Sequence, residues 1–199
     1  MNRLYIKILS FFIAILDKEN KEKITLFLKK KLKNKKIKII DVGAHKGETI
    51  QLFVDKFNIS KILAFEANPY VFNILKDRVN KIESKKKINL FNCGLGEKRD
   101  KKILQIFNDT SSSTFNSINR KSTYFKRKNF FLSFFKKNIF LKKKLLEIYP
   151  LSNFHEFAKM KKIDILKIDT EGYEFNILKG IKPKDLARIT FIYFEHHYD

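Results

Sequence analysis

The chain has few of the features that mark secreted or membrane-spanning proteins. Its 199 residues include one cysteine, Cys93, so no internal disulfide can form, and this fits a reducing cytoplasm. The apolar N-terminal stretch at residues 4–16 is interrupted by Lys7 and is shorter than the roughly 20 residues of a membrane span. Charged residues follow it, where a signal peptide would have a small-residue cleavage site. We therefore expect a cytoplasmic protein. Its N-terminal stretch would dock on the protein's own core or, alternatively, on the inner face of an anionic membrane.

Acidic residues are scarce, with 21 Asp and Glu against 43 Lys and Arg and a net charge of +22. Such an excess can favour an acidic partner, but these lysines are spread along the whole chain, as background composition would be. Hydrophobic residues make up 44% of the chain, enough for the core of one α/β domain, and wholesale disorder is not expected. We divide the chain into an N-terminal helical segment, residues 1–35, and one domain, residues 36–199.

Glycines are also few, and their placement argues against one common class of ligand. Residues 37–47, IKIIDVGAHKG, form a short apolar run, then an acid, then two glycines four positions apart. Helical spacing starts after Gly47, so a buried strand enters a tight turn that opens a helix. Open α/β sheets bind nucleotide-like ligands at such a turn. The loop lacks the Gly-x-Gly-x-x-Gly of dinucleotide sites, because His45 replaces the second glycine, so a nicotinamide oxidoreductase is not favoured.

Two acids at the ends of predicted strands indicate a different ligand. Asp41 precedes the glycine turn, where a carboxylate suits a cation bearing an α-amino or sulfonium group, and Gly43 and Gly47 let the backbone approach closely. Glu66 closes the next strand, in LAFEANP, and can accept hydrogen bonds from both ribose hydroxyls, while Asn68 shapes the turn beside it. The alternative is an ordinary strand–helix turn in which Asp41 only caps the helix.

The predicted fold class is α/β with a mostly parallel sheet. Five apolar runs do not alternate with polar residues, as is typical of buried parallel strands: Ile37–Asp41, Lys61–Glu66, Ile88–Asn92, Ile163–Asp169 and Ile189–His196. Helical patterns between them predict right-handed crossovers. Pro69 begins one helix, Ser152 is expected to cap a short one, and another is predicted over Gly172–Lys179. The runs Leu104–Phe107 and Leu145–Tyr149 are predicted to be accessory strands.

The remaining strand ends carry further polar candidates. The Asn92 amide is placed to face an adenine edge, while Cys93 beside it is expected only to pack. Asp169 and Glu171, in IDILKIDTEGYE, could line an acceptor site, accept a proton or bind a divalent cation, although Asp169 could instead cap the next helix. His196 ends the last predicted strand and is either a general base or a histidine of the surface or packing.

Together these motifs resemble the FkbM-type family of S-adenosylmethionine-dependent methyltransferases. The matching pieces are DVGAHKGET, AFEANPYVF, the CGLG turn, the TSSS run and LSNFHEFAKMKKIDILKIDTEGYE. The resemblance runs from about Lys36 to His197, apart from a basic, aromatic insertion near residues 120–144. It implies the Rossmann-like, three-layer class I methyltransferase fold, with S-adenosyl-L-methionine as cofactor. The resemblance implies no metal-binding residues.

The resemblance also implies roles for individual residues. Cofactor contacts are expected from Asp41, Gly43, Ala44, His45 and Gly47 at the methionine end, and from Glu66, Asn68 and Asn92 around the ribose and base. Asp169, Glu171 and His196 are expected near the acceptor, with His196 or Asp169 taking a proton. The family commonly has Asn where His45 stands and an acid where Ser152 stands. It also has a C-terminal hairpin beyond the fifth strand, which this chain, ending at Asp199, lacks.

The expected reaction is O-methylation of a hydroxyl, on a sugar of a glycan or on a related metabolite, in polysaccharide biosynthesis. Two alternatives stay open. An RNA-directed methyltransferase would use the basic and aromatic residues of Asp109–Lys144 to stack on and neutralise nucleic acid, although such a stretch is more often a solvated excursion. A non-catalytic, truncated domain would explain the early end of the sheet. The sequence predicts no oligomeric state.

Overall fold

The computed structural model describes residues 20, 22–33, 35–107, 113–116 and 142–194. The predicted apolar stretch at residues 4–16, most of the basic insertion and His196 lie outside these residues. A helix over residues 22–32 comes first. The elements that follow are β1 (Ile37–Val42), α2 (Glu48–Lys56), β2 (Ile59–Phe65), α3 (Pro69–Asn80), η1 (Lys85–Lys87), β3 (Ile88–Phe91), β4 (Gly94–Leu95), β5 (Asp100–Ile106), β6 (Lys142–Tyr149), η3 (Leu151–Asn153), α5 (His155–Ala158), β7 (Ile163–Ile168), α6 (Glu174–Lys179), α7 (Pro183–Leu186) and β8 (Ile189–Phe194).

The main sheet has five strands in the order β3-β2-β1-β7-β8, and every neighbouring pair is parallel. All five strands predicted from the apolar runs are therefore confirmed, and the fold is Rossmann-like α/β. The chain progresses outward from β1 to β3 on one side and from β7 to β8 on the other. β1 is thus the switch point of the sheet, and the loops after β1 and β7 leave it side by side.

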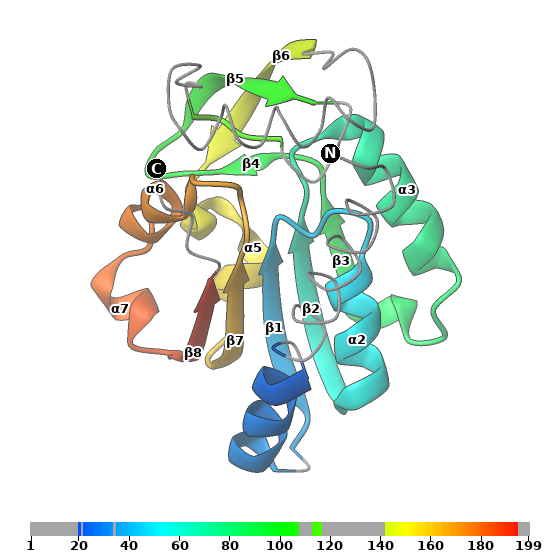
Figure 1. Cartoon of the computed structure of the whole chain (residues 1–199). Coiled ribbons are helices and arrows are strands. Elements are labelled where there is room, and N and C mark those ends of the chain that lie inside the picture. The colour runs from blue at the N-terminus through cyan, green and yellow to red at the C-terminus, as the bar shows by residue number, and fades with distance from the viewer. Residues whose placement is uncertain (1–19, 21, 34, 108–112, 117–141, 195–199) are drawn as a thin grey trace, which may run out of the picture.

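Two apolar clusters cover the two faces of this sheet and give the fold three layers. On one face Ile39, Ile62 and Ile165 pack against the helix at 22–32, α2 and α3. On the other face Ile40 and Leu166 pack against α5, α6 and α7. Consecutive residues of β1 and β7 feed opposite clusters, because side chains alternate across a strand. Figure 1 shows α2 and α3 on one side of the sheet and α5, α6 and α7 toward the other.

A second, three-stranded sheet in the order β4-β6-β5 lies over the carboxyl ends of the main strands (Figure 1). β5 and β6 are antiparallel. β6 contains the predicted accessory strand Leu145–Tyr149, and β5 contains the predicted run Leu104–Phe107 up to Ile106. Gly94 pairs with Ile148 directly after the end of β3. This short connection holds the accessory sheet close above the loops that follow β1, β2 and β7.

Two local predictions need correction. Ser152 does not cap α5, because it lies inside the 3-10 turn η3 and Phe154 occupies the cap position without a side-chain hydrogen bond. The helix predicted from Gly172 begins two residues later, at Glu174, because Gly172 adopts a left-handed φ of 96° and belongs to the preceding turn. α3 begins at Pro69 as predicted, and Asn68 is its N-cap: Asn68 Oδ1 accepts the backbone N–H of Tyr70 at 3.1 Å.

Candidate functional site

The loop after β1 is held in a conformation that few side chains adopt. Gly43, His45 and Gly47 have φ of 75°, 49° and 84°, all in the left-handed region. Asn, Asp and His tolerate this region better than other non-glycine residues, so His45 can occupy this position. A Cβ on Gly43 would lie 1.8 Å from the backbone oxygen of Asp169. The loop therefore passes directly against the end of β7, and only glycine fits there.

Glu66 joins this loop to the end of β2. Its two carboxylate oxygens accept the backbone N–H groups of His45 at 2.8 Å and of Asn68 at 2.7 Å. The side chain is 8% exposed. Burial raises the pKa of Glu66 to about 7, although both backbone hydrogen bonds oppose the shift. Glu66 is thus fixed in place and changes charge near neutral pH.

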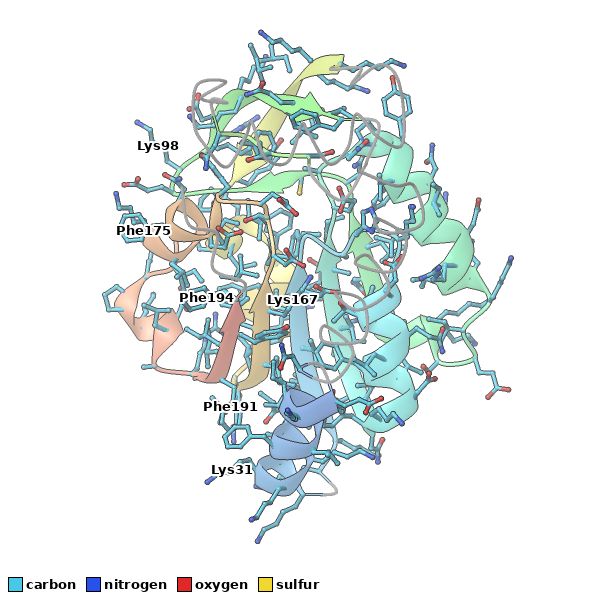
Figure 2. The ribbon with its side chains drawn as sticks, viewed as in Figure 1. Lys31, Lys98, Lys167, Phe175, Phe191 and Phe194 are labelled. Carbon is cyan, nitrogen blue, oxygen red and sulfur yellow. The ribbon has the colours of Figure 1, made fainter. Side chains whose placement is uncertain are left out.

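Lys167 is the cation at the centre of the site and is the last residue but one of β7 (Figure 2). Its Nζ lies 3.1 Å from Asp41 Oδ1 and 3.4 Å from Asp169 Oδ2, and it donates to the Gly43 carbonyl at 2.9 Å. Burial alone would lower its pKa, but attraction to Asp41 and Asp169 outweighs burial and raises the pKa of Lys167. One ammonium group therefore ties together β1, the glycine loop and the end of β7.

The turn after β7 is pinned from two sides. Glu174 Oε1 accepts the N–H groups of Thr170 at 2.8 Å and Gly172 at 3.1 Å, together with the Thr170 hydroxyl at 3.1 Å. From the other side, the Thr114 hydroxyl donates to the Glu171 carbonyl at 2.8 Å, and the Asn116 amide donates to the Gly172 carbonyl at 2.7 Å. These bonds hold Glu171 at a φ of 54°. Glu174, rather than Asp169, thus caps the turn.

The Glu174→Ala variant is expected to lose about 1–3 kcal/mol of unfolding free energy, because the N–H groups of Thr170 and Gly172 lose their acceptor in a partly buried turn. Glu174→Gln keeps an amide oxygen for the same donors and should cost less than about 1 kcal/mol. Urea unfolding of both variants measures the difference. Equal losses for Ala and Gln would show that the acceptor oxygen does not hold the turn.

These loops enclose a cavity of about 280 Å³ beneath the accessory sheet. Four of its lining residues are carboxylates, Glu48, Glu66, Asp169 and Glu171, and the one lysine among them is Lys167. The roof is apolar and aromatic, with Leu95, Leu104, Phe115 and Tyr173. In a chain of net charge +22, the described lining of this cavity is acidic. The arrangement suits a cationic ligand with one apolar, flat part.

The structure brings most of the predicted site residues to this cavity. Its lining includes Gly43, Ala44, His45, Glu66, Asp169 and Glu171. Gly47 is not among the lining residues; it is the N-cap residue of α2, at the end of the same loop. His196 lies outside the described residues, so its placement near the acceptor stays a prediction.

Besides Gly47, three predicted cofactor residues do not line the cavity, and the structure gives each of them a supporting contact instead. Asp41 is 0% exposed, and its carboxylate forms an ion pair with the Lys167 ammonium group. The Asn92 amide donates to the Glu66 carbonyl at 2.8 Å, and the Asn68 side chain caps α3. Asp41, Asn68 and Asn92 therefore support the residues of the cavity wall.

Lys167 is the functional residue that sequence reasoning missed. The signal was a lysine inside IDILKID, a run predicted to be a buried strand. All six residues of β7 are buried in the structure. A lysine in such a strand needs an anionic partner. Strand pairing supplies it, because Asp41 of β1 and Lys167 of β7 are register partners.

Sequence comparison identifies the family. A family profile described as "Methyltransferase FkbM domain" matches residues 41–199, which is most of the chain. The chain belongs to the FkbM methyltransferase family. The matched region contains the glycine loop, Glu66, Lys167 and the turn after β7. The helix at residues 22–32 lies outside it. No curated protein matches the chain.

Two solved structures match the FkbM chain. One is the methyltransferase FkbM from Methylobacillus flagellatus KT, with 17% identity and a TM-score of 0.44, covering 73% of this chain and 28% of that one. The other is the methyltransferase domain of bacterial CtHen1-C, with 25% identity and a TM-score of 0.32, covering 39% of this chain and 40% of that one. The chain thus spans less than half the length of either protein. The fold assignment rests on the strand order, not on these low scores.

Within residues 20, 22–33, 35–107, 113–116 and 142–194, no helix is both long and apolar enough to cross a membrane. In the same part of the chain, no group of three or more His, Cys, Asp or Glu side chains is placed to hold a metal ion.

Proposed function

We propose that this FkbM protein is an S-adenosyl-L-methionine-dependent O-methyltransferase. The observation that carries the proposal is the charge of the cavity at the switch point, where four lining carboxylates face one lysine inside a strongly basic chain. A sulfonium ligand with an α-amino group brings positive charge to such a site. A phosphate-rich dinucleotide would be repelled by the same carboxylates.

Individual residues of the cavity fit the parts of this cofactor. Gly43 leaves the backbone of the loop open for close approach, and the acidic residues Glu48 and Asp169 suit the charged methionine end. Glu66 is fixed by its two backbone hydrogen bonds and can accept from both ribose hydroxyls. Leu95 and Phe115 in the roof offer an apolar surface to a purine ring. When bound, the cofactor supplies an electrophilic methyl group on a sulfonium sulfur.

The proposed reaction is methyl transfer to an acceptor hydroxyl. The acceptor oxygen would gain the methyl group as a new O–CH₃ bond, the sulfur would keep the electron pair of the S–CH₃ bond, and a carboxylate of the cavity would take the hydroxyl proton. Asp169 is our candidate for that base, because its side chain is 35% exposed and lines the cavity. Lys167 holds Asp169 in place at 3.4 Å. His196 is a second candidate base.

Calorimetry with S-adenosylhomocysteine tests the proposal. We expect saturable one-to-one binding to the wild-type chain. The Glu66→Ala variant should bind at least about tenfold more weakly, because hydrogen bonds to a charged acceptor contribute about 1.5–3 kcal/mol. Glu83→Ala, which removes an exposed carboxylate from another part of the surface, is the control and should bind like wild type. Absence of binding to wild type, or wild-type affinity for Glu66→Ala, would refute the proposal.

The same titration should depend on pH in a defined direction. Glu66 has a pKa of about 7 in the free protein and accepts ribose hydrogen bonds best when ionised, so affinity should rise as pH increases. Between pH 6 and pH 8 the ionised fraction rises about tenfold, and affinity should follow. Near pH 7, binding should release up to about half a proton, seen as a dependence of heat on the buffer. Glu66→Gln should lose both effects.

We further propose that the acceptor hydroxyl belongs to a sugar of a glycan or to a related metabolite, that the reaction serves polysaccharide biosynthesis, and that it takes place in the cytoplasm. The lone cysteine supports the last point, since a single Cys93 can form no internal disulfide. Peripheral association with an anionic membrane through residues 4–16 is part of the same proposal. Sedimentation with anionic and neutral vesicles tests it.

A further inference from the structure

A second, smaller cavity of about 50 Å³ lies beside the first, on the sheet face covered by the helix at 22–32 and α2. Three residues line both cavities: Thr49, Lys167 and Asp169. The two spaces therefore meet at the candidate base. A group in the small cavity and a group in the large one would both contact Asp169.

The lining of the small cavity is amphipathic. Ile24, Leu28, Leu52 and Phe53 supply apolar surface, while Thr25, Tyr193 and the three shared residues bring polar groups. Thr25 is buried on its helix, at 7% exposure. A pocket with apolar walls and a few hydroxyls next to a carboxylate fits a short alcohol, which has a carbon part and one hydroxyl.

The size of the cavity limits what can enter. A cavity of roughly 150 Å³ holds a benzene molecule, and this one has about a third of that volume. It therefore accepts a group of two or three heavy atoms and excludes a sugar ring. A hydroxymethyl arm meets both the size and the polarity, whereas a secondary ring hydroxyl would bring its two neighbouring carbons with it.

We propose that this second cavity receives the hydroxymethyl arm of the acceptor, so that the methylated group is a primary alcohol. The inference rests on the proposed function for its reaction: the alcohol oxygen would take the methyl group as the S–CH₃ bond breaks with its electron pair left on sulfur, and the alcohol proton would pass to Asp169, which lines both cavities. Ile24, Thr25 and Leu28 come from the helix at 22–32, which precedes the family match at residues 41–199. The choice of acceptor would thus be made partly by a segment that the family profile does not cover.

The test uses ethanol as a three-heavy-atom probe and the full chain carrying labelled Ile and Leu methyl groups, observed by NMR with S-adenosylhomocysteine present. Saturable shifts are expected for the methyls of Ile24, Leu28 and Leu52. The apparent Kd should be millimolar or weaker, since the best small ligands gain about 1.5 kcal/mol per heavy atom. Leu26 is 66% exposed on the same helix and is the reference methyl, which should shift only linearly.

Variants locate the binding. Leu28→Phe fills the cavity and should abolish the saturable shifts, while Thr25→Val and Tyr193→Phe should each weaken binding about 2- to 10-fold, the effect of one hydrogen bond. The Thr25→Val and Tyr193→Phe results decide the matter if Leu28→Phe fails to fold. Linear shifts at all methyls, or unchanged saturation in these two variants, would overturn the inference. Binding of S-adenosylhomocysteine without ethanol binding rejects this cavity alone, whereas ethanol binding without S-adenosylhomocysteine binding rejects the proposed function.

Discussion

The Lys167→Met variant is expected to lose about 3–5 kcal/mol of unfolding free energy, the cost of leaving a buried charge without its partner. Asp41 is 0% exposed and Lys167 is its ion-pair partner at 3.1 Å. Methionine has nearly the length of lysine, so packing changes little, and the loss measures the unpaired carboxylate. The Gly43 carbonyl also loses its donor. Urea unfolding by circular dichroism measures the change in stability.

A second variant shows whether charge is the cause. In the double variant Asp41→Asn/Lys167→Met the buried carboxylate is gone, and we expect at least about 2 kcal/mol of the loss to be recovered. The control is Lys161→Met, at an exposed position two residues before β7. Its free energy of unfolding should stay within about 0.5 kcal/mol of the wild-type value. A cost below about 1 kcal/mol for Lys167→Met alone would mean that the pair does not stabilise the site.

The ion pair between Asp41 and Lys167 is a feature that the sequence alone did not predict. The apolar runs identified all five strands of the main sheet, and parallel strands place their carboxyl ends at one edge. Gly43, Glu66 and Asp169 could therefore be assigned to one site from their positions at strand ends. The partnership of Asp41 with Lys167 depends on the register between β1 and β7, far apart in the chain, and a one-residue slip would turn each side chain to the other face.

The supporting contacts of the site were equally hidden from local patterns. Asn92 and Asn68 were assigned to the ligand because they follow strands, but their amides satisfy backbone groups nearer to them, such as the carbonyl of Glu66 and the N–H of Tyr70. The Thr114 and Asn116 contacts to the turn after β7 span more than fifty residues of chain. No periodicity or motif encodes such pairings, because tertiary packing decides them.

The Gly43→Ala variant is expected to lose more than about 4 kcal/mol of stability, a loss that few single substitutions cause. A left-handed backbone alone costs an alanine about 1–2 kcal/mol. The remainder comes from the new Cβ, which would lie 1.8 Å from the Asp169 oxygen and 2.9 Å from its carbonyl carbon. Both are backbone atoms at the end of a central strand, so the loop and β7 must separate.

Gly47→Ala is the matched comparison, because Gly47 has the same backbone region but different neighbours. Its φ is 84°, and an added Cβ would meet side-chain atoms, Leu75 Cδ1 at 2.9 Å and Arg78 Cδ at 3.4 Å. Leu75 is 0% exposed and must adjust within the core. We expect a loss of about 2–3 kcal/mol, of which about 1–2 kcal/mol is the backbone cost and about 1 kcal/mol is the repacking of Leu75. Urea unfolding of the two variants therefore isolates the contact between the loop and β7. If both lost the same free energy, the close approach would contribute nothing, and the larger cavity would not depend on it for its shape.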